Sequence, residues 1–161
     1  MSYFASFYIN VRVAECESAY TFNDFEEMSL KHHALGKMSN TRGKIALGSG
    51  IFFWQSNHLI LGDECYGDDD IIETNVCDFI ASHKCFLDAF KDRSGVDVVF
   101  CVNIFNYPDV LINGFFISLL VLNAILDVGG EIEFTNKNFE NLDSLQRYID
   151  SLAIFSKCNL Q

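Results

Sequence analysis

Acidic and basic residues are segregated along the middle of this chain. Between Met28 and Gly62 there are four basic residues and no acid, whereas residues 63–78 contain seven acids and no base. Such an acidic run can steer association with a cationic surface and occupy a groove built for phosphates. The alternative is a solvated loop whose charges complement the start of a helix. The predicted partner-binding patch consists of Asp63, Glu64, Asp68, Asp69, Asp70 and Glu73.

Other kinds of chemistry lack the spacing that they need. Calcium loops place acids at alternating positions around a glycine, and the run 65–70 does not keep that spacing. His32 and His33 are adjacent, so they point to different sides of a helix and form no zinc pair. Ser49 lies outside a nucleophile elbow, and the chain has no glycine-rich phosphate-binding motif. We therefore expect no metal, no cofactor and no enzymatic activity.

The remaining histidine and thiol candidates are expected to be structural. His83 falls on the apolar face of a predicted helix, where a histidine is more often a packed core group than a ligand. The six cysteines include no Cys-x-x-Cys pair, and no export signal precedes the first predicted strand. Four of them have apolar neighbours and are expected to behave as small buried hydrophobes: Cys77, Cys85, Cys101 and Cys158. These features predict reduced cysteines and a cytoplasmic location.

Composition and charge narrow the choice of partner. The chain has 161 residues, half of them apolar, which is typical of one folded domain. Its net charge of −11 would be repelled by nucleic-acid phosphates and anionic lipid, so we expect neither as a partner. The longest apolar run, Phe115–Leu126, is shorter than the roughly 20 residues that a membrane-spanning helix needs.

Periodicity and turn residues predict the elements that must position these groups. The first half is expected to contain a strand at 3–13, a helix from Asp24 to Leu35 stopped by Gly36, a loop at 39–43, and strands at 45–54 and 59–61 joined by a hairpin turn at 55–58. The second half is expected to contain a helix at 71–93, strands at 96–105, 115–117 and 131–134, a helix at 119–127 capped by Ser118, a connector at 136–141, and an amphipathic helix from Leu142 to Leu152. This order predicts a single α+β domain over 1–161, with a mostly antiparallel sheet, helices packed on one face, and a C-terminal helical extension at about 136–161.

Motifs in the last two thirds of the domain resemble those of a known kind of protein. They are the helix end at 91–95, the strand Val-Asp-Val-Val-Phe-Cys-Val at 96–102, the segment Asn113–Ser118 before an apolar helix, the strand Gly-Glu-Ile-Glu-Phe at 130–134, and Trp54 at a strand end. The arrangement resembles a family of small bacterial α+β proteins that look like immunity proteins encoded beside secreted or contact-delivered toxins. The resemblance implies a cytosolic antitoxin and supplies no catalytic residue.

The residues and the resemblance together predict a toxin inhibitor. We expect the acidic patch to bind a cognate protein toxin that is itself basic, such as a nuclease, and to block it. A rival binding mode adds a strand of the partner to a sheet edge. Two other functions stay open: a small-molecule-binding or enzymatic domain with an apolar pocket, and a structural homodimer that uses the helix at 119–126.

Overall fold

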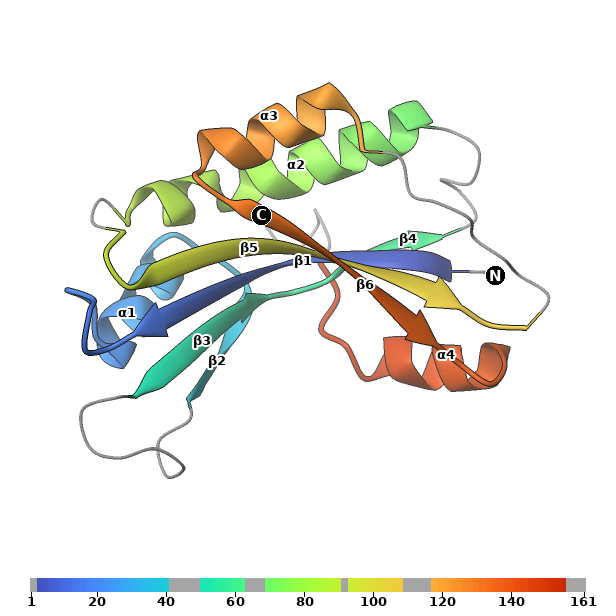
Figure 1. Ribbon diagram of the computed structural model, residues 1–161, viewed down its shortest axis with the longest axis horizontal. Helices are drawn as coiled ribbons and strands as arrows, with labels where there is room; N and C mark the ends of the chain where they lie inside the picture. The colour runs from blue at the N-terminus through green and yellow to red at the C-terminus, as the bar shows by residue number, and fades with distance from the viewer. Residues whose placement is uncertain (1–2, 41–49, 63–68, 91–92, 109–116, 156–161) are drawn as a thin grey trace.

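The computed structural model describes residues 3–40, 50–62, 69–90, 93–108 and 117–155 (Figure 1). Within them lie six strands and four helices. The strands are β1 (Tyr3–Ala14), β2 (Gly36–Asn40), β3 (Ile51–Ser56), β4 (Leu59–Gly62), β5 (Val96–Asn106) and β6 (Glu131–Asn138). The helices are α1 (Phe22–Lys31), α2 (Asp69–Asp88), α3 (Leu119–Asp127) and α4 (Leu142–Asp150).

β1 lies at the centre of the sheet and confirms the strand predicted at 3–13. Its apolar side chains recur at every second residue, so one row points into the main core: Phe7, Ile9, Val11 and Val13, all fully buried. β5 pairs antiparallel with one side of β1, and β3 and β4 pair antiparallel with the other side. The single domain is therefore built around a mostly antiparallel sheet, in the order β2-β3-β1-β5-β6.

β3 and β4 do not form the hairpin that the sequence predicts at 55–58. β3 pairs with residues 10–14 of β1 and β4 pairs with residues 3–7, so the chain runs along β1 without reversing. At the break between them, the Ser56 hydroxyl accepts a hydrogen bond from the Ile9 amide at 2.8 Å. The polar residues at 55–58 therefore form no turn. They separate two apolar segments, β3 and β4, that both pair with the same side of β1. Residues 45–49 of the predicted strand lie outside the described residues.

The segment before β3 also differs from its prediction. Thr21, not Asp24, caps α1, and Asp24 completes a capping box by accepting from the Thr21 amide. The helix ends at Lys31, and His33 adopts a left-handed φ of 54° that turns the chain into β2. Gly36 is a strand residue and not a helix stop. A Cβ there would lie 2.5 Å from ring atoms of Trp54, so only glycine fits.

β6 adds a parallel edge to the sheet. Ser118 caps α3 as predicted, and α3 ends at Asp127 as predicted. The strand predicted at 131–134 is confirmed but continues to Asn138, so the first half of the predicted connector at 136–141 is strand. β6 pairs in parallel with β5, which makes β5-α3-β6 a crossover unit with α3 over the sheet. Arg93 donates to the carbonyls of Leu87 and Val128 at 3.0 Å, which joins the ends of α2 and α3.

Helices cover both faces of the sheet, which corrects the expectation of one covered face. α1, α2 and α3 pack on the face that carries the main core. α4 lies on the opposite face, where Leu145 and Ile149 pack against Phe105 and Tyr107 (Figure 1). After α4 the chain returns to the sheet, and the Phe155 amide donates to the His58 carbonyl at 2.8 Å.

The remaining predicted elements agree with the structure to different degrees. The helix predicted at 71–93 is present as α2 but ends at Asp88. The amphipathic helix predicted from Leu142 to Leu152 is present as α4, which ends at Asp150. Ile117 is not in a strand, and the other two residues of the strand predicted at 115–117 lie outside the described residues.

Candidate protein-binding surface

The predicted acidic patch lies at the start of α2 and only partly within the described residues. Asp63, Glu64 and Asp68 lie outside them. Asp69 is the first residue of α2, Asp70 is exposed, and Glu73 is half-buried one turn later. Negative charge at this end complements the helix dipole. Asp70 also borders a shallow hollow of about 260 Å³ with Ile71, Thr74 and Asn75, which contains no basic group.

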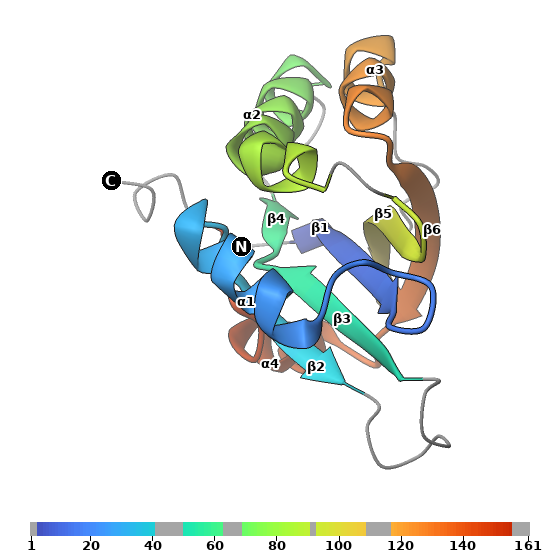
Figure 2. The same cartoon turned by 90° about the vertical axis from the view of Figure 1, so that its left-hand side faces the viewer.

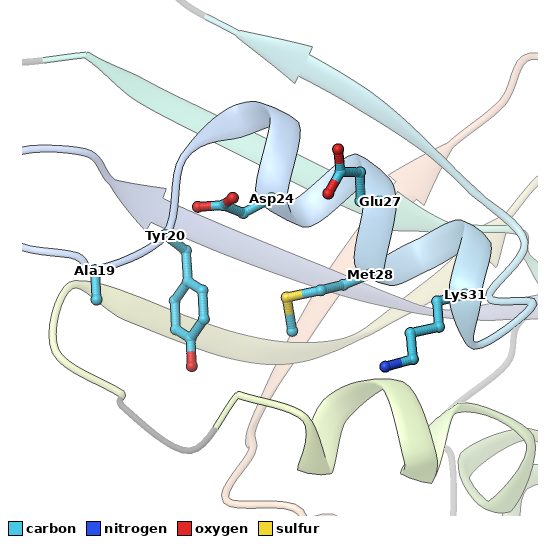
Figure 3. Close-up of a pocket in the computed structure, with 6 residues that line it drawn as sticks. All are labelled: Ala19, Tyr20, Asp24, Glu27, Met28 and Lys31. Carbon is cyan, nitrogen blue, oxygen red and sulfur yellow. The ribbon is translucent and has the colours of Figure 1, made fainter.

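A second hollow, of about 440 Å³, lies beside α1. Its lining residues are Ala19, Tyr20, Asp24, Glu27, Met28 and Lys31 (Figure 3). Asp24 is already engaged as the capping residue of α1. In Figure 3 the carboxylates of Asp24 and Glu27 point away from the amine of Lys31. The groups do not converge on one point, so the hollow lacks the geometry of a catalytic site.

α3 carries the most conspicuous surface in the described part of the chain. It is the outer helix above the β6 edge of the sheet (Figure 2). Val121 and Ile125 point into the core and are almost fully buried. The outer side of this short helix carries large apolar side chains beside the exposed Asn123, and Leu119 and Leu126 are about 70% exposed. The exposed leucines are Leu119, Leu120, Leu122 and Leu126.

The neighbouring strand β6 extends this apolar character to the edge of the sheet. Phe134 is 51% exposed although its partner in the register, Val102, is fully buried in the core. Phe134 therefore lies on the face of the sheet that α3 covers, in the strand at the edge of the sheet. We call the four exposed leucines of α3 together with Phe134 the α3–β6 surface. Exposed large apolar groups gathered in this way mark interaction sites more often than scattered ones do.

Sequence reasoning identified α3 as very apolar but could not locate this surface. A helix that is apolar all round is typical of a buried helix, and periodicity alone does not show which side is left uncovered. The position of β6 at the sheet edge is also a long-range property. The available signal was the apolar segment 119–126, which the sequence analysis assigned to a possible homodimer interface.

Buried polar groups gather on the other face of the sheet, under α4. The rings of Tyr8 and His58 stack at 4.3 Å, and Asn103 donates to the Ser6 hydroxyl at 3.4 Å. Burial and the nearby Lys137 ammonium lower the pKa of His58 to about 4, so its imidazole is neutral at pH 7. Burial, together with Cys101, raises the pKa of Tyr8. These groups are held in their uncharged forms.

The histidine and cysteine candidates show no activated nucleophile among the described residues. His83 is buried, and its Nδ1 lies 2.7 Å from the Phe79 carbonyl oxygen, which confirms the prediction of a packed core histidine. Burial lowers the pKa of His83 and raises the pKa of the Cys101 thiol. Cys101 is buried as expected, but Cys77 is half-buried and Cys85 is exposed. Cys158 lies outside the described residues.

No group of three or more His, Cys, Asp or Glu side chains in the described part of the chain is arranged to hold a metal ion. None of the helices in the described ranges is both long enough and apolar enough to cross a bilayer. Comparisons with protein-family models, with curated proteins and with solved structures give no match to this chain.

Proposed function

We propose that this protein binds another protein through the α3–β6 surface, and that it acts as a cytosolic immunity protein that blocks a basic toxin. The observation that carries the proposal is the outward row of leucines on α3. Full burial of one such side chain contributes roughly 1.5–3 kcal/mol. A partner that covers several of them would gain binding free energy that offsets part of the cost of association.

The charge of the chain supports a basic partner. The net charge is −11, and an acid lies near one end of each of two neighbouring helices: Asp70 near the start of α2 and Asp127 at the end of α3. Electrostatic complementarity of this kind mainly raises the association rate and the specificity. A nuclease-type toxin has a cationic active site, so an acidic binder is suited to occlude it. The motif resemblance to immunity proteins points to the same role.

The test is capture with a matched set of variants. The tagged protein is used to capture its partner, including the product of the gene immediately upstream, at low and at high salt. We expect the wild type to capture a basic protein in a salt-sensitive way and to inhibit that protein's activity. The double variant Leu119→Gln/Leu126→Gln should lose capture by about tenfold or more, because glutamine keeps helix propensity but removes apolar area.

The control for this experiment is Leu30→Gln. Leu30 is 71% exposed, as is Leu119, but it lies on α1, away from the α3–β6 surface. Its substitution should leave capture unchanged. Equal capture by the wild type, the control and the double variant would contradict the proposed surface.

The second candidate function is a homodimer that buries the same leucines. The exposed face of α3 favours it, whereas the large like charge of two copies opposes it. Sedimentation at several protein concentrations separates the two functions. A mass of two chains that falls to one chain in the double glutamine variant would favour the homodimer, and a constant single-chain mass would exclude it.

A further inference from the structure

Among the described residues, β6 is the last strand at one edge of the sheet. It pairs with β5 on one side, and within the described residues no strand pairs with its other side. The Phe139 amide, which directly follows β6, donates to the Asn106 carbonyl at 2.8 Å, so residue 139 faces β5. Backbone groups alternate in direction along a strand. The amides and carbonyls that point outward are therefore those of Ile132, Phe134, Asn136 and Asn138.

The two edges of the sheet are not equivalent. On the opposite side of the sheet the edge strands are β2, with five residues, and β4, with four, and short edge strands are a common protection against unwanted pairing. β6 has eight residues, contains no proline and keeps an unbroken register with β5 from Glu131 to Asn138. β6 therefore offers the longer and more regular template for an added strand.

The side chains of β6 determine which types of side chain an added strand needs. Ile132 and Phe134 lie on the face that α3 covers, and Phe134 is half exposed. Glu131 and Glu133 lie on the opposite face and are exposed. A strand added beside β6 would place one row of its side chains next to Phe134 and the other row next to the two glutamates. Lys137 lies further along the second row, where its amine is over the ring of Tyr148. Apolar residues suit the first row and cationic residues suit the second.

We propose that the open edge of β6 accepts an extended segment of a partner protein in which apolar residues alternate with lysine or arginine, so that the segment becomes a further strand of the sheet. This inference rests on the proposed function and specifies how the partner is held. Main-chain hydrogen bonds to the four outward residues supply part of the affinity, and the alternating side chains supply the specificity.

The direct test uses a synthetic eight-residue peptide of alternating valine and lysine as the probe. Amide hydrogen exchange of the intact protein is followed by NMR with and without the peptide. We expect the four outward amides, at positions 132, 134, 136 and 138, to become protected by about tenfold or more. The amides of Glu133 and Thr135 already face β5 and should change little. A peptide with glutamate in place of lysine should bind at least about tenfold more weakly.

A variant pair tests the same edge through affinity. Asn136→Pro removes one outward amide, and proline is tolerated at an edge position whose amide faces solvent. Asn136→Ala is the matched control, because it loses the same side chain and keeps the amide. Peptide affinity should fall by about tenfold in the proline variant relative to the alanine variant. Equal affinities, binding without protection of the outward amides, or no peptide binding would each overturn the proposal.

Failure of this inference can be distinguished from failure of the proposed function. If Asn136→Pro still captures the partner whereas the double glutamine variant of α3 does not, the partner docks on the leucines and not on the strand edge. If the proline variant fails to fold, the exchange experiment on the wild-type protein still decides the question.

Discussion

At the scale of single residues, burial favours the uncharged forms of His58, His83 and Cys101, as the shifts in their pKa values indicate. His58 is almost fully buried against Tyr8, and its pKa is lowered to about 4. The sequence placed His58 in a turn and gave no sign of this burial, because the contact depends on the pairing of β1 with the segment 51–62. His83 was predictable, since its apolar neighbours recur at helical spacing.

The lowered pKa of His58 has a consequence for stability. The His58 imidazole takes up a proton near pH 6.5 in the unfolded chain and near pH 4 in the folded chain. The stability that comes from keeping this imidazole neutral is therefore fully present above about pH 6.5 and is lost as the pH falls toward 4. His58→Phe keeps an aromatic ring beside Tyr8 and removes the titration. Between pH 7 and pH 5, the free energy of unfolding should fall by roughly 1–2 kcal/mol less in this variant than in the wild type.

Urea denaturation at the two pH values measures this difference. Every other titratable group is the same in the two proteins, so the contributions of those groups cancel in the comparison. Equal losses of stability in the wild type and His58→Phe would show that His58 is not held neutral by burial.

At the scale of elements, local signals predicted well and long-range pairing did not. Ser118 and the apolar run after it predicted the bounds of α3. The apolar periodicity of 72–90 predicted α2, but the predicted end at 93 lies five residues beyond the observed end at Asp88. The prediction of a hairpin at 55–58 was wrong. The turn-forming residues there lie between two segments, β3 and β4, that both pair with β1, and they do not reverse the chain. β2 was missed because Gly36 and its polar neighbours are typical of a loop, and only Trp54 explains why glycine stands in a strand.

The packing of β2 on Trp54 gives a prediction for Gly36→Ala. The added methyl group would collide with ring atoms of Trp54 and with the Gln55 carbonyl oxygen, so we expect a loss of about 1–3 kcal/mol. The control is Ser39→Ala at an exposed position of the same strand, which should change stability by less than about 0.5 kcal/mol. Thermal or urea unfolding monitored by Trp54 fluorescence measures both. A neutral Gly36→Ala would contradict the pairing of β2 with β3.

At the scale of the whole molecule, we propose that negative charge raises the rate of association and that exposed apolar area supplies the affinity. The sequence predicted the acidic character and a protein partner, but it could not predict the α3–β6 surface. That surface exists because β5, α3 and β6 form a crossover unit at the sheet edge, with no further described element outside it. The acids at 63–73 remain the predicted source of electrostatic attraction.

The acidic run gives a prediction for association kinetics. Replacing Asp68, Asp69 and Asp70 together by asparagine should slow association with a basic partner by about tenfold at low salt and leave dissociation nearly unchanged. Replacement by lysine should slow it further, and the protein should remain folded. Surface plasmon resonance at about 50 mM and about 300 mM salt measures both rates, and the effect should shrink at the higher salt. Unchanged affinity in the lysine variant would contradict a role for the acids.

The most direct test of the proposed surface is the exchange footprint of the complex with the captured partner. Hydrogen–deuterium exchange of the protein alone and in complex is compared along the whole chain. We predict new protection over α3 and β6, at 119–127 and 131–138, with a weaker effect at the start of α2. Protection confined to α1 or to the face under α4, with α3 and β6 unchanged, would contradict the account.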